Sequence, residues 1–423
     1  MILHLDLNDM LYALSYALDC VEGELLGARA YHSERVAYIA VRIAGTMGIP
    51  ADGLSALAAA AVLHDNALTE YIGSERSSLE ERDVDPDSAA ARDVYLGEIR
   101  ANFERHCSVG ERNVQVLPFY DRIRGAVQCH HENADGSGVY HLAPGETPLF
   151  AQLIHFADVL DNRFDLSEVD EKKHREIHAF AAENRGRLFS AQLVEAFEQT
   201  FPLRTEDLLM ENASRALLHD ILPAQPREYS GAEIEGIASL FAHIVDYKSH
   251  FTCTHSIGIA RKVRSMAAFY RFEPEMQTKL YLAGALHDIG KCSIPNSILE
   301  KPDSLTAEEF AVMKKHVLIS WRILDRIEGF SDIRDWAALH HEKLNGQGYP
   351  FGKTAAELSF NDRLMGCIDV YQALTEARPY RGGMPHRDAV AVMEGMASEN
   401  LIDAGITRDI DARFGELGRD GLL

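Results

Sequence analysis

With 423 residues, the chain is too long for one typical domain core and has room for two or three. Hydrophobic residues make up 46% of it and charged residues 25%, which is ordinary for a folded, soluble protein and excludes a collagen-like or low-complexity chain. The formal net charge of −23 argues against binding of long DNA or RNA as the main function, because a negative surface repels polyanions.

No stretch of the sequence predicts a membrane span or a secretion signal. The apolar runs are too short to cross a bilayer, and the N-terminus lacks a basic stretch followed by an apolar core. The six cysteines include no C-x-x-C pair and fit reduced thiols. Cys129, Cys292 and Cys367 neighbour candidate metal ligands but need no role beyond that of small buried residues. We therefore expect a cytoplasmic protein with no membrane partner.

Apolar residues recur at helical spacing along most of the chain. Residues 36–44 and 280–286 place them three and four positions apart, whereas the strict alternation of a half-buried strand is scarce. Glycine and proline interrupt these stretches, for example at residues 48–50, 144–146 and 382–383. The sequence predicts an all-α fold.

The chain contains an internal repeat of histidine and aspartate residues. His32-Ser33 recurs as His255-Ser256 and His64-Asp65 recurs as His287-Asp288, in each case 223 residues later. Further matches, at shifts of 210 or 211 residues, join His106 to His316, His130-His131-Glu132 to His340-His341-Glu342, and Asp158 to Asp369. The offset changes once, so the first copy carries 13 extra residues, in the charged stretch around residues 74–93.

The two copies separate near residues 222–226, where two prolines interrupt the helical pattern. Ser230 then stands where it can cap the next helix. We therefore predict two tandem helical domains, residues 1–222 and residues 223–423.

Five histidines and two aspartates in one order, twice in one chain, favour metal binding, although a single histidine on a helix is more often structural. Neutral imidazole binds Fe, Mn or Zn, and a carboxylate can bridge two cations. His287 and Asp288 are adjacent on a predicted helix, so Asp288 can lie between two metals while His287 holds one of them. Two such cations would activate a bridging hydroxide and clamp a phosphate for in-line attack. Lys291, four residues after His287, can reach that phosphate or the leaving oxygen, unless it is a solvated charge.

The second copy carries a longer signature than its histidines alone. It consists, in order, of His255, His287-Asp288-Ile289-Gly290-Lys291, His316, His340-His341-Glu342, Asn345-Gly346-Gln347-Gly348-Tyr349-Pro350, Asp369 and Arg378-Pro379-Tyr380-Arg381. Over residues 230–400 this order resembles the HD-GYP subgroup of the HD superfamily of metal-dependent phosphohydrolases. The resemblance implies that the chain holds two tandem HD domains, the second of them catalytic.

The resemblance also implies an activity, the hydrolysis of a cyclic dinucleotide, mainly cyclic di-GMP, to a linear dinucleotide or to GMP. The implied metal ligands are His255, His287, Asp288, His316, His340, His341 and Asp369. Asp288 and Lys291 would be catalytic, and the implied substrate or supporting contacts are Lys291, Gly348, Tyr349, Arg378 and Arg381. Glu342 would at most orient a neighbouring histidine.

The resemblance bears on the number of metals as well. Some members of the subgroup hold a third metal through a glutamate four residues before the first histidine. Phe251 occupies that position here and cannot ligate, so we expect two divalent cations per site, with Fe or Mn favoured.

The first copy keeps the ligand pattern, so we expect a second metal site built from His32, His64, Asp65, His106, His130, His131 and Asp158. It has Leu68 where the second copy has Lys291, and its loop at residues 135–140 lacks the Gly-Tyr-Pro ending. Three roles stay open for it: a second enzyme site with altered specificity, a metal-holding regulatory domain, or a structural domain.

The sequence thus predicts a phosphodiesterase that hydrolyses cyclic di-GMP through a two-metal-activated hydroxide in the C-terminal domain. Hydrolysis of another nucleotide, such as a mixed cyclic dinucleotide, is the enzymatic alternative. A signalling scaffold that binds metal and nucleotide without turnover is the non-enzymatic one, although Lys291 and the loop at residues 348–350 argue against it. Homodimerisation and a signalling-protein partner at that loop stay open.

Overall fold

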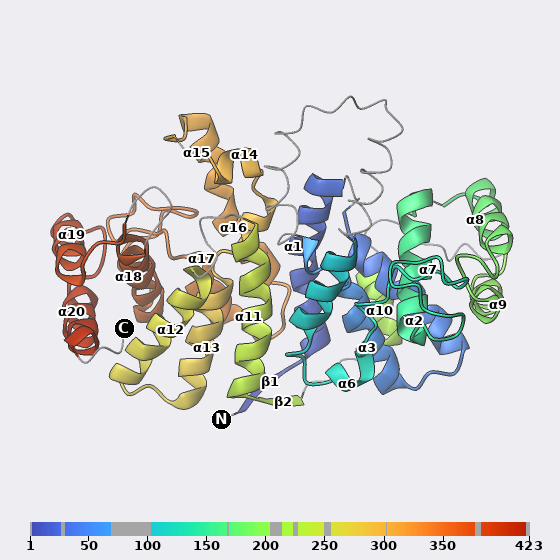
Figure 1. Cartoon of the computed structure of the whole chain (residues 1–423). Helices are drawn as coiled ribbons and strands as arrows, with labels where there is room; N and C mark the ends of the chain where they lie inside the picture. The colour runs from blue at the N-terminus through green and yellow to red at the C-terminus, as the bar shows by residue number, and fades with distance from the viewer. Residues whose placement is uncertain are drawn as a thin grey trace. The chain divides into compact units, whose positions relative to one another are not determined.

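The fold is almost entirely helical, which confirms the all-α prediction (Figure 1). The computed structural model describes residues 2–26, 30–68, 103–166, 169–203, 214–222, 227–248, 255–301, 303–376 and 382–419. No helix within these ranges is long and apolar enough to cross a membrane. The chain divides into two compact units, an N-terminal unit (Asp6–Gln225) and a C-terminal unit (Met1–Leu5 with Pro226–Leu423).

One small sheet joins the start of the chain to the C-terminal unit. Strand β1 (Ile2–Leu5) pairs in antiparallel fashion with β2 (Arg227–Ser230). Helix α11 (Gly231–Tyr247) follows, and Ser230 and Glu233 form a capping box at its start, which confirms the cap predicted from the sequence. The proposed division of the chain at residues 222 and 223 stays a prediction.

The N-terminal unit packs its helices around α2, whose apolar face was evident in the sequence. Its helices are α1 (Leu7–Leu26), α2 (His32–Thr46), α3 (Ala51–Val62), a helix over residues 103–114, α6 (Tyr120–Ile123), α7 (Leu149–Phe164), α8 (Glu171–Glu183), α9 (Ala191–Thr200) and α10 (Ser214–Ile221). Helix α2 contacts both α3 and α7. The alanines of α3 from Ala58 to Ala61 are fully buried, and their small side chains allow the two helix backbones to approach closely.

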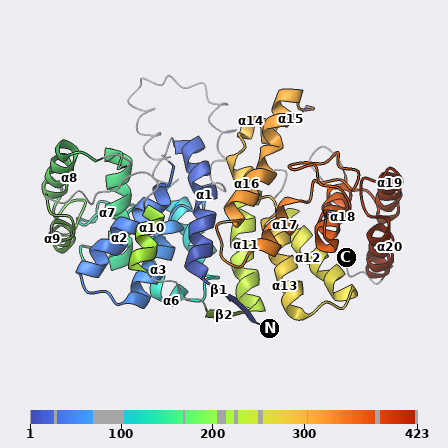
Figure 2. The same cartoon turned by 180° about the vertical axis from the view of Figure 1, so that it is seen from behind.

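The C-terminal unit repeats this pattern around α12 and α13. After α11 its helices are α12 (His255–Phe269), α13 (Pro274–Leu286), the short 3-10 helix η1 (Ile289–Ser293), α14 (Asn296–Leu299), α15 (Ala307–Met313), α16 (Lys315–Leu324), α17 (Ser331–Ala338), α18 (Phe360–Thr375), α19 (His386–Ser398) and α20 (Ala404–Arg419). Helices α12 and α13 lie side by side in both views (Figure 1, Figure 2). A Cβ atom at Gly284 of α13 would stand 2.8 Å from the Ala260 Cα of α12, so only glycine allows this approach.

Candidate metal centres

The seven ligand residues predicted for the second copy come from five regions of the C-terminal unit and converge on one buried point. His255 begins α12, His287 and Asp288 follow α13, and His316 lies in α16. The remaining three are His340 and His341, after α17, and Asp369, in α18. All except His341 are buried. Their role as metal ligands stays a prediction, but the fold brings together all seven.

Asp288 occupies the centre of this cluster. Its Oδ2 atom lies 3.1 Å from the Nε2 of His287 and 4.0 Å from that of His255. Its Oδ1 atom lies 3.3 Å from the Nε2 of His316 and 4.0 Å from that of His340. Each carboxylate oxygen therefore faces two imidazole nitrogens, so oxygen and nitrogen donors converge at the centre of the cluster.

Asp369 closes the other side of the cluster. Its Oδ1 atom lies 3.7 Å from the Nε2 of His255, and its Oδ2 atom lies 3.8 Å from the Nδ1 of His341. Burial lowers the pKa of His341 to about 3, so this ring is neutral near pH 7 and offers a lone pair. Both carboxylates are thus surrounded by nitrogen donors.

The imidazole rings are held so that Nε2 points inward. His287, His316 and His340 each donate an Nδ1–H bond to the backbone carbonyl three residues earlier, at 2.8, 2.7 and 2.6 Å. The Nδ1 of His255 instead contacts the Glu376 carboxylate at 2.7 Å. An acceptor at Nδ1 fixes the proton there and leaves the Nε2 lone pair free for a metal.

These inward-facing atoms have no hydrogen-bond partner among the described residues. They are the Nε2 atoms of His287, His316 and His340 and the Oδ1 atom of Asp288, all buried. Buried polar atoms are almost always satisfied in native proteins, so a group of unsatisfied donor atoms at one point favours a cation-binding site. Neutral imidazoles around a carboxylate are a donor set that suits divalent Fe, Mn or Zn, and the residues present fit such a centre.

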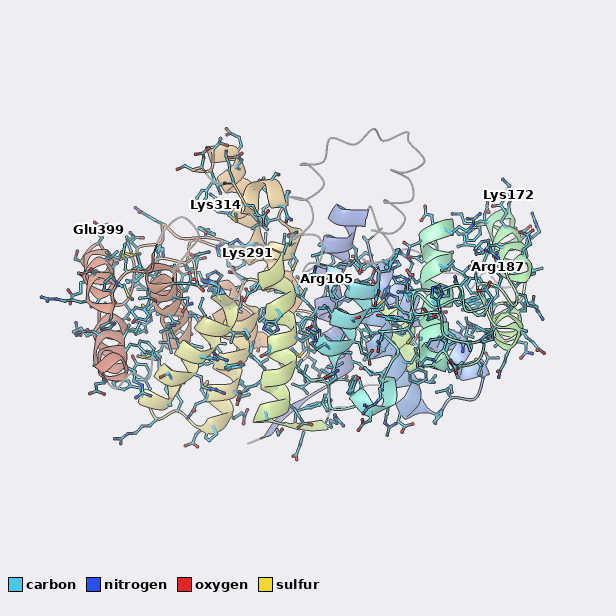
Figure 3. The ribbon with its side chains drawn as sticks, viewed as in Figure 1. Arg105, Lys172, Arg187, Lys291, Lys314 and Glu399 are labelled. Carbon is cyan, nitrogen blue, oxygen red and sulfur yellow. The ribbon has the colours of Figure 1, made fainter. Side chains whose placement is uncertain are left out.

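Lys291, which is labelled in Figure 3, belongs to the C-terminal unit. Its side chain lies against the Asp288 carboxylate. Its Nζ is 2.5 Å from the Asp288 Oδ2 atom. Burial acts to raise the pKa of the Asp288 carboxyl, but the neighbouring His287 imidazole and Lys291 ammonium outweigh it and hold this pKa well below its usual range. The structure corrects one detail here: α13 ends at Leu286, so the His-Asp pair lies at a helix junction and Lys291 is carried by η1.

The loop after the histidine pair packs onto the cluster. The Tyr349 ring lies 4.9 Å from the His341 ring, centroid to centroid. A Cβ atom at Gly348 would stand 2.4 Å from the Glu342 Cα, so the loop needs glycine there. Among the described residues, the Glu342 carboxylate accepts backbone N–H bonds from the loop, including that of Phe351 at 2.7 Å. The histidine-orienting role that the resemblance suggested stays a prediction. Arg378 and Arg381, like Phe251, lie outside the described residues.

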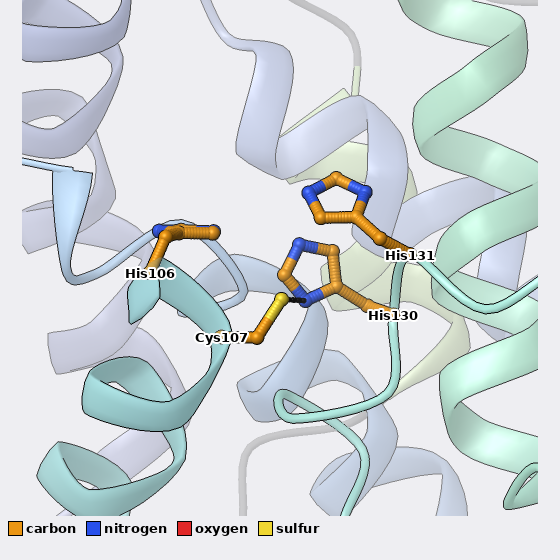
Figure 4. A group of neighbouring side chains, drawn as sticks. All are labelled: His106, Cys107, His130 and His131. Atoms are coloured by element: carbon orange, nitrogen blue, oxygen red, sulfur yellow. Dashed lines mark hydrogen bonds between the residues drawn. The ribbon is translucent and has the colours of Figure 1, made fainter. Parts of the chain in front are cut away.

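The N-terminal unit builds a similar cluster from the first copy. Asp65 Oδ1 lies 2.8 Å from the His106 Nε2 and 3.5 Å from the His130 Nε2, and its Oδ2 lies 3.6 Å from the His64 Nε2. Asp158 Oδ1 is 3.3 Å from the His32 Nε2. The ring of His131, the seventh predicted residue, lies 3.9 Å from that of His130 (Figure 4). The fold again brings together all seven residues.

The N-terminal cluster differs from its counterpart at the position of the lysine and at a thiol. Leu68, which replaces Lys291, is buried. The Cys107 Sγ lies 3.9 Å from the His130 Nδ1, and Figure 4 shows this thiol beside the ring. The sequence drew attention to Cys129 rather than to Cys107, although Cys107 directly follows a candidate ligand.

Three carboxylates near the clusters were not predicted from the sequence. Glu376 holds His255, and Asp161 holds His32, with 2.7 Å between its Oδ2 and the His32 Nδ1. Glu22, in α1, is 1% exposed and lies with His32 and Asp65 in the N-terminal cluster. The repeat could not reveal them, because Glu376 follows Asp369 by seven residues whereas Asp161 follows Asp158 by three, and Glu22 precedes the pattern altogether.

Both clusters lie within segments of the chain that match a known domain. Models of the HD domain match residues 29–163 and residues 239–406. The 3′3′-cGAMP-specific phosphodiesterase 3 of Vibrio cholerae is 31% identical, and the match covers 79% of this chain and 71% of that protein. This chain belongs to the HD family. It is a tandem HD protein and, as a member, a metal-dependent phosphohydrolase.

Other relatives of the tandem HD protein carry related names. The 3′3′-cGAMP-specific phosphodiesterase 1 of Vibrio cholerae is 29% identical over 95% of this chain and 90% of its own length. A cyclic di-GMP phosphodiesterase of Pseudomonas aeruginosa is 34% identical over 34% of this chain and 35% of its own length. A crystal structure of a cyclic GMP-AMP specific phosphodiesterase of Vibrio cholerae covers 98% of both chains with a TM-score of 0.64 and 23% identity, which shows a shared fold.

Proposed function

We propose that the C-terminal unit hydrolyses a phosphodiester bond of a cyclic dinucleotide. The observation that carries this proposal is Lys291, held 2.5 Å from Asp288 at the edge of a cluster of buried imidazoles with orphaned Nε2 atoms. Such a cluster can hold cations, and an ammonium group beside it can hold the anion on which they act. Relatives named as cyclic dinucleotide phosphodiesterases support the substrate class.

Seven residues would hold the metals: His255, His287, Asp288, His316, His340, His341 and Asp369. Two divalent cations are proposed, with Fe or Mn favoured because imidazole and carboxylate ligands suit them. When bound, they supply Lewis acidity that neutralises phosphate charge and makes water more acidic. Asp288, with each oxygen facing two imidazoles, would hold the cations from the centre of the cluster.

The chain's own residues would orient the substrate and stabilise the charge that develops on it. The Lys291 Nζ would donate hydrogen bonds to a phosphate oxygen of the scissile bond and to the leaving 3′ or 5′ oxygen as its charge develops. The backbone carbonyls and Glu376 that hold the Nδ1 atoms keep the ligand rings in place during turnover. Tyr349 covers one face of His341 and would limit the entry of bulk water.

Among cyclic dinucleotides, 3′3′-cGAMP is the substrate we propose first. The two relatives that match most of this chain, at 95% and 79% coverage, are both named as specific for it. Cyclic di-GMP, the substrate predicted from the sequence, is the second candidate. It is favoured by relatives of 34% identity that match 41% and 34% of the chain.

Product analysis tests the proposal directly. The full chain, loaded with Mn(II) or Fe(II), is incubated with 3′3′-cGAMP or with cyclic di-GMP, beside Asp288→Ala and Asp65→Ala variants, and the products are separated by chromatography. We expect linear dinucleotide or mononucleotides from the wild type and from Asp65→Ala, and none from Asp288→Ala. No turnover of either nucleotide by the metal-loaded wild type would contradict the proposal.

The other expectations from the sequence are proposals of lower rank. A homodimer, a signalling-protein partner at the loop of residues 345–350 and a cytoplasmic location all stay predictions. The acidic composition still argues against a nucleic-acid polymer as partner.

A further inference from the structure

Glu22 carries a buried carboxylate for which the described part of the chain offers no hydrogen-bond partner. Glu22 lies in α1 and is 1% exposed, and neither of its carboxylate oxygens accepts a hydrogen bond from the described residues. Asp19, one turn earlier on α1, shows the usual solution, since its Oδ1 accepts hydrogen bonds from the Ser33 N–H and Oγ–H at 3.0 and 2.8 Å. A buried carboxylate without such donors is unfavourable unless it is neutral or faces a cation.

The surroundings of Glu22 are those of a cation site. One ligand atom each from Glu22, His32 and Asp65 lie within 4.8 Å of one another. The same unit has further unpartnered donor atoms nearby, since the Nε2 atoms of His64 and His130 are buried without a hydrogen bond. Carboxylate oxygens and imidazole nitrogens converging from α1, α2 and the segment after α3 form a donor set for a divalent metal.

The charge balance of the N-terminal cluster points the same way. In the C-terminal cluster the Lys291 ammonium lies against the central aspartate. In the N-terminal cluster the corresponding residue of the sequence is Leu68, and among the described residues the Asp65 carboxylate pairs only with histidines. Glu22 adds a carboxylate to the N-terminal cluster, whereas Lys291 adds a cation to the C-terminal one. The N-terminal cluster therefore attracts a cation more strongly and offers no lysine to a phosphate.

We propose that Glu22 is a ligand of a divalent metal centre in the N-terminal unit, together with His32 and Asp65. Because Glu22 supplies an additional carboxylate ligand, this centre retains its metal when no substrate phosphate is bound. Of the three roles left open for the first copy, a metal-holding domain without turnover fits this geometry. The proposal is independent of the substrate of the C-terminal unit.

The test measures how much Mn(II) the full chain binds and how tightly. Asp288→Ala removes the central carboxylate of the C-terminal cluster, so Mn(II) bound by this variant reports the N-terminal unit. Glu22→Gln is then added, and Mn(II) content and affinity are measured by elemental analysis and equilibrium titration. We expect at least about tenfold weaker Mn(II) binding, and a smaller Mn(II)-dependent rise of the thermal midpoint, because one ligand is lost.

The Glu22→Gln variant also tests the alternative that Glu22 is protonated and binds no metal, because glutamine has the shape of a neutral glutamic acid. If Glu22 is simply protonated and buried, Glu22→Gln leaves the Mn(II) affinity unchanged, and the proposal is overturned. Glu111→Gln is the matched control. Glu111 is also buried, at 5% exposure, but its carboxylate accepts backbone N–H bonds from Gly125 and Gln128, so its loss should lower stability without changing Mn(II) affinity.

A second variant covers the case in which Glu22→Gln does not fold. Glu22→Asp keeps the charge but shortens the side chain by one methylene, which withdraws the carboxylate from the metal. We expect this variant to fold and to bind Mn(II) more weakly than its parent. Equal Mn(II) affinity in Glu22→Asp and its parent would overturn the proposal.

Discussion

At the scale of single residues, the two clusters differ most at the lysine of the second copy. The Lys291 Nζ contacts Asp288, whereas Leu68 of the N-terminal unit can neither pair with Asp65 nor bind an anion. A cation placed for the scissile phosphate raises the rate without being needed for the fold.

We therefore expect Lys291→Met to keep its metal and to lose activity. The loss in kcat/KM should be at least about 100-fold, equivalent to roughly 3 kcal/mol of transition-state stabilisation. Turnover and metal content are measured on the same preparation, with Leu68→Met as the control in the other unit. Full activity in Lys291→Met would show that the ammonium group has no role in the reaction.

His255 makes the stability of the metal-free protein depend on pH. Burial acts to lower its pKa, but its contacts with Asp369 and Glu376 outweigh burial and raise the pKa to about 9, from 6.5. A histidine with a raised pKa stabilises the fold fully below pH 6.5, and this stabilisation is lost as the pH rises through 9. The contribution is up to about 3 kcal/mol.

In the presence of a chelator, the free energy of unfolding of the C-terminal unit should therefore fall between pH 6.5 and pH 9. His255→Gln, which cannot be protonated, should show a smaller fall over the same interval. Denaturant titrations of both proteins at the two pH values measure the difference. Parallel pH profiles for the two proteins would rule out this role for the imidazolium.

At the scale of secondary-structure elements, the close approach of η1 to α16 brings the His-Asp pair to His316. Gly290 of η1 makes this contact possible, because a Cβ atom there would stand 2.1 Å from the His316 backbone oxygen. The Ser320 hydroxyl of α16 strengthens the contact, since it accepts a hydrogen bond from the Gly290 N–H at 2.9 Å and donates one to the His287 carbonyl.

Gly290→Ala should force η1 and α16 apart and displace His316. We expect a loss of stability of about 1–3 kcal/mol, as for overpacking of a core, together with weaker metal binding. Gly395→Ala is the matched control in the same unit, because a Cβ atom there meets nothing within 4 Å and alanine favours the helix. Thermal midpoints and Mn(II) affinity distinguish the two; equal midpoints would contradict the packing argument.

Element positions also limited what the sequence could predict. The apolar periodicity predicted helices over residues 36–44 and 280–286, and α2 and α13 confirm them. Periodicity did not reveal that α13 stops at Leu286, because the turn before η1 depends on the contact with α16 rather than on a local breaker residue. Helix ends of this kind are decided by tertiary packing.

At the scale of the whole molecule, the helices of each unit gather carboxylates at one buried point, together with imidazole nitrogens that have no hydrogen-bond partner among the described residues. A bound cation offsets the unfavourable burial of these carboxylates, and it can do so only in the folded state. Metal binding should therefore stabilise each unit. With free metal at 1,000 times its Kd, the stabilisation would be about 4 kcal/mol.

Chelation should therefore lower the thermal midpoint of the protein, and added Mn(II) should restore it. In Asp288→Ala the remaining shift should come from the N-terminal unit, and adding Asp65→Ala should abolish it. Scanning calorimetry with EDTA and then with excess Mn(II) provides the measurement. A thermal midpoint that changes neither with EDTA nor with excess Mn(II) would show that neither cluster binds metal in the folded protein.

The sequence by itself determined the fold class, the repeat and the identity of the fourteen candidate ligands. It could do so because metal chemistry admits few residue types and because the chain repeats them in one order. Only the tertiary structure revealed the partners that hold or extend these clusters, namely Glu22, Asp161 and Glu376. Their places depend on how helices pack against each other, and no local pattern in the sequence records which side chain a neighbouring helix will present.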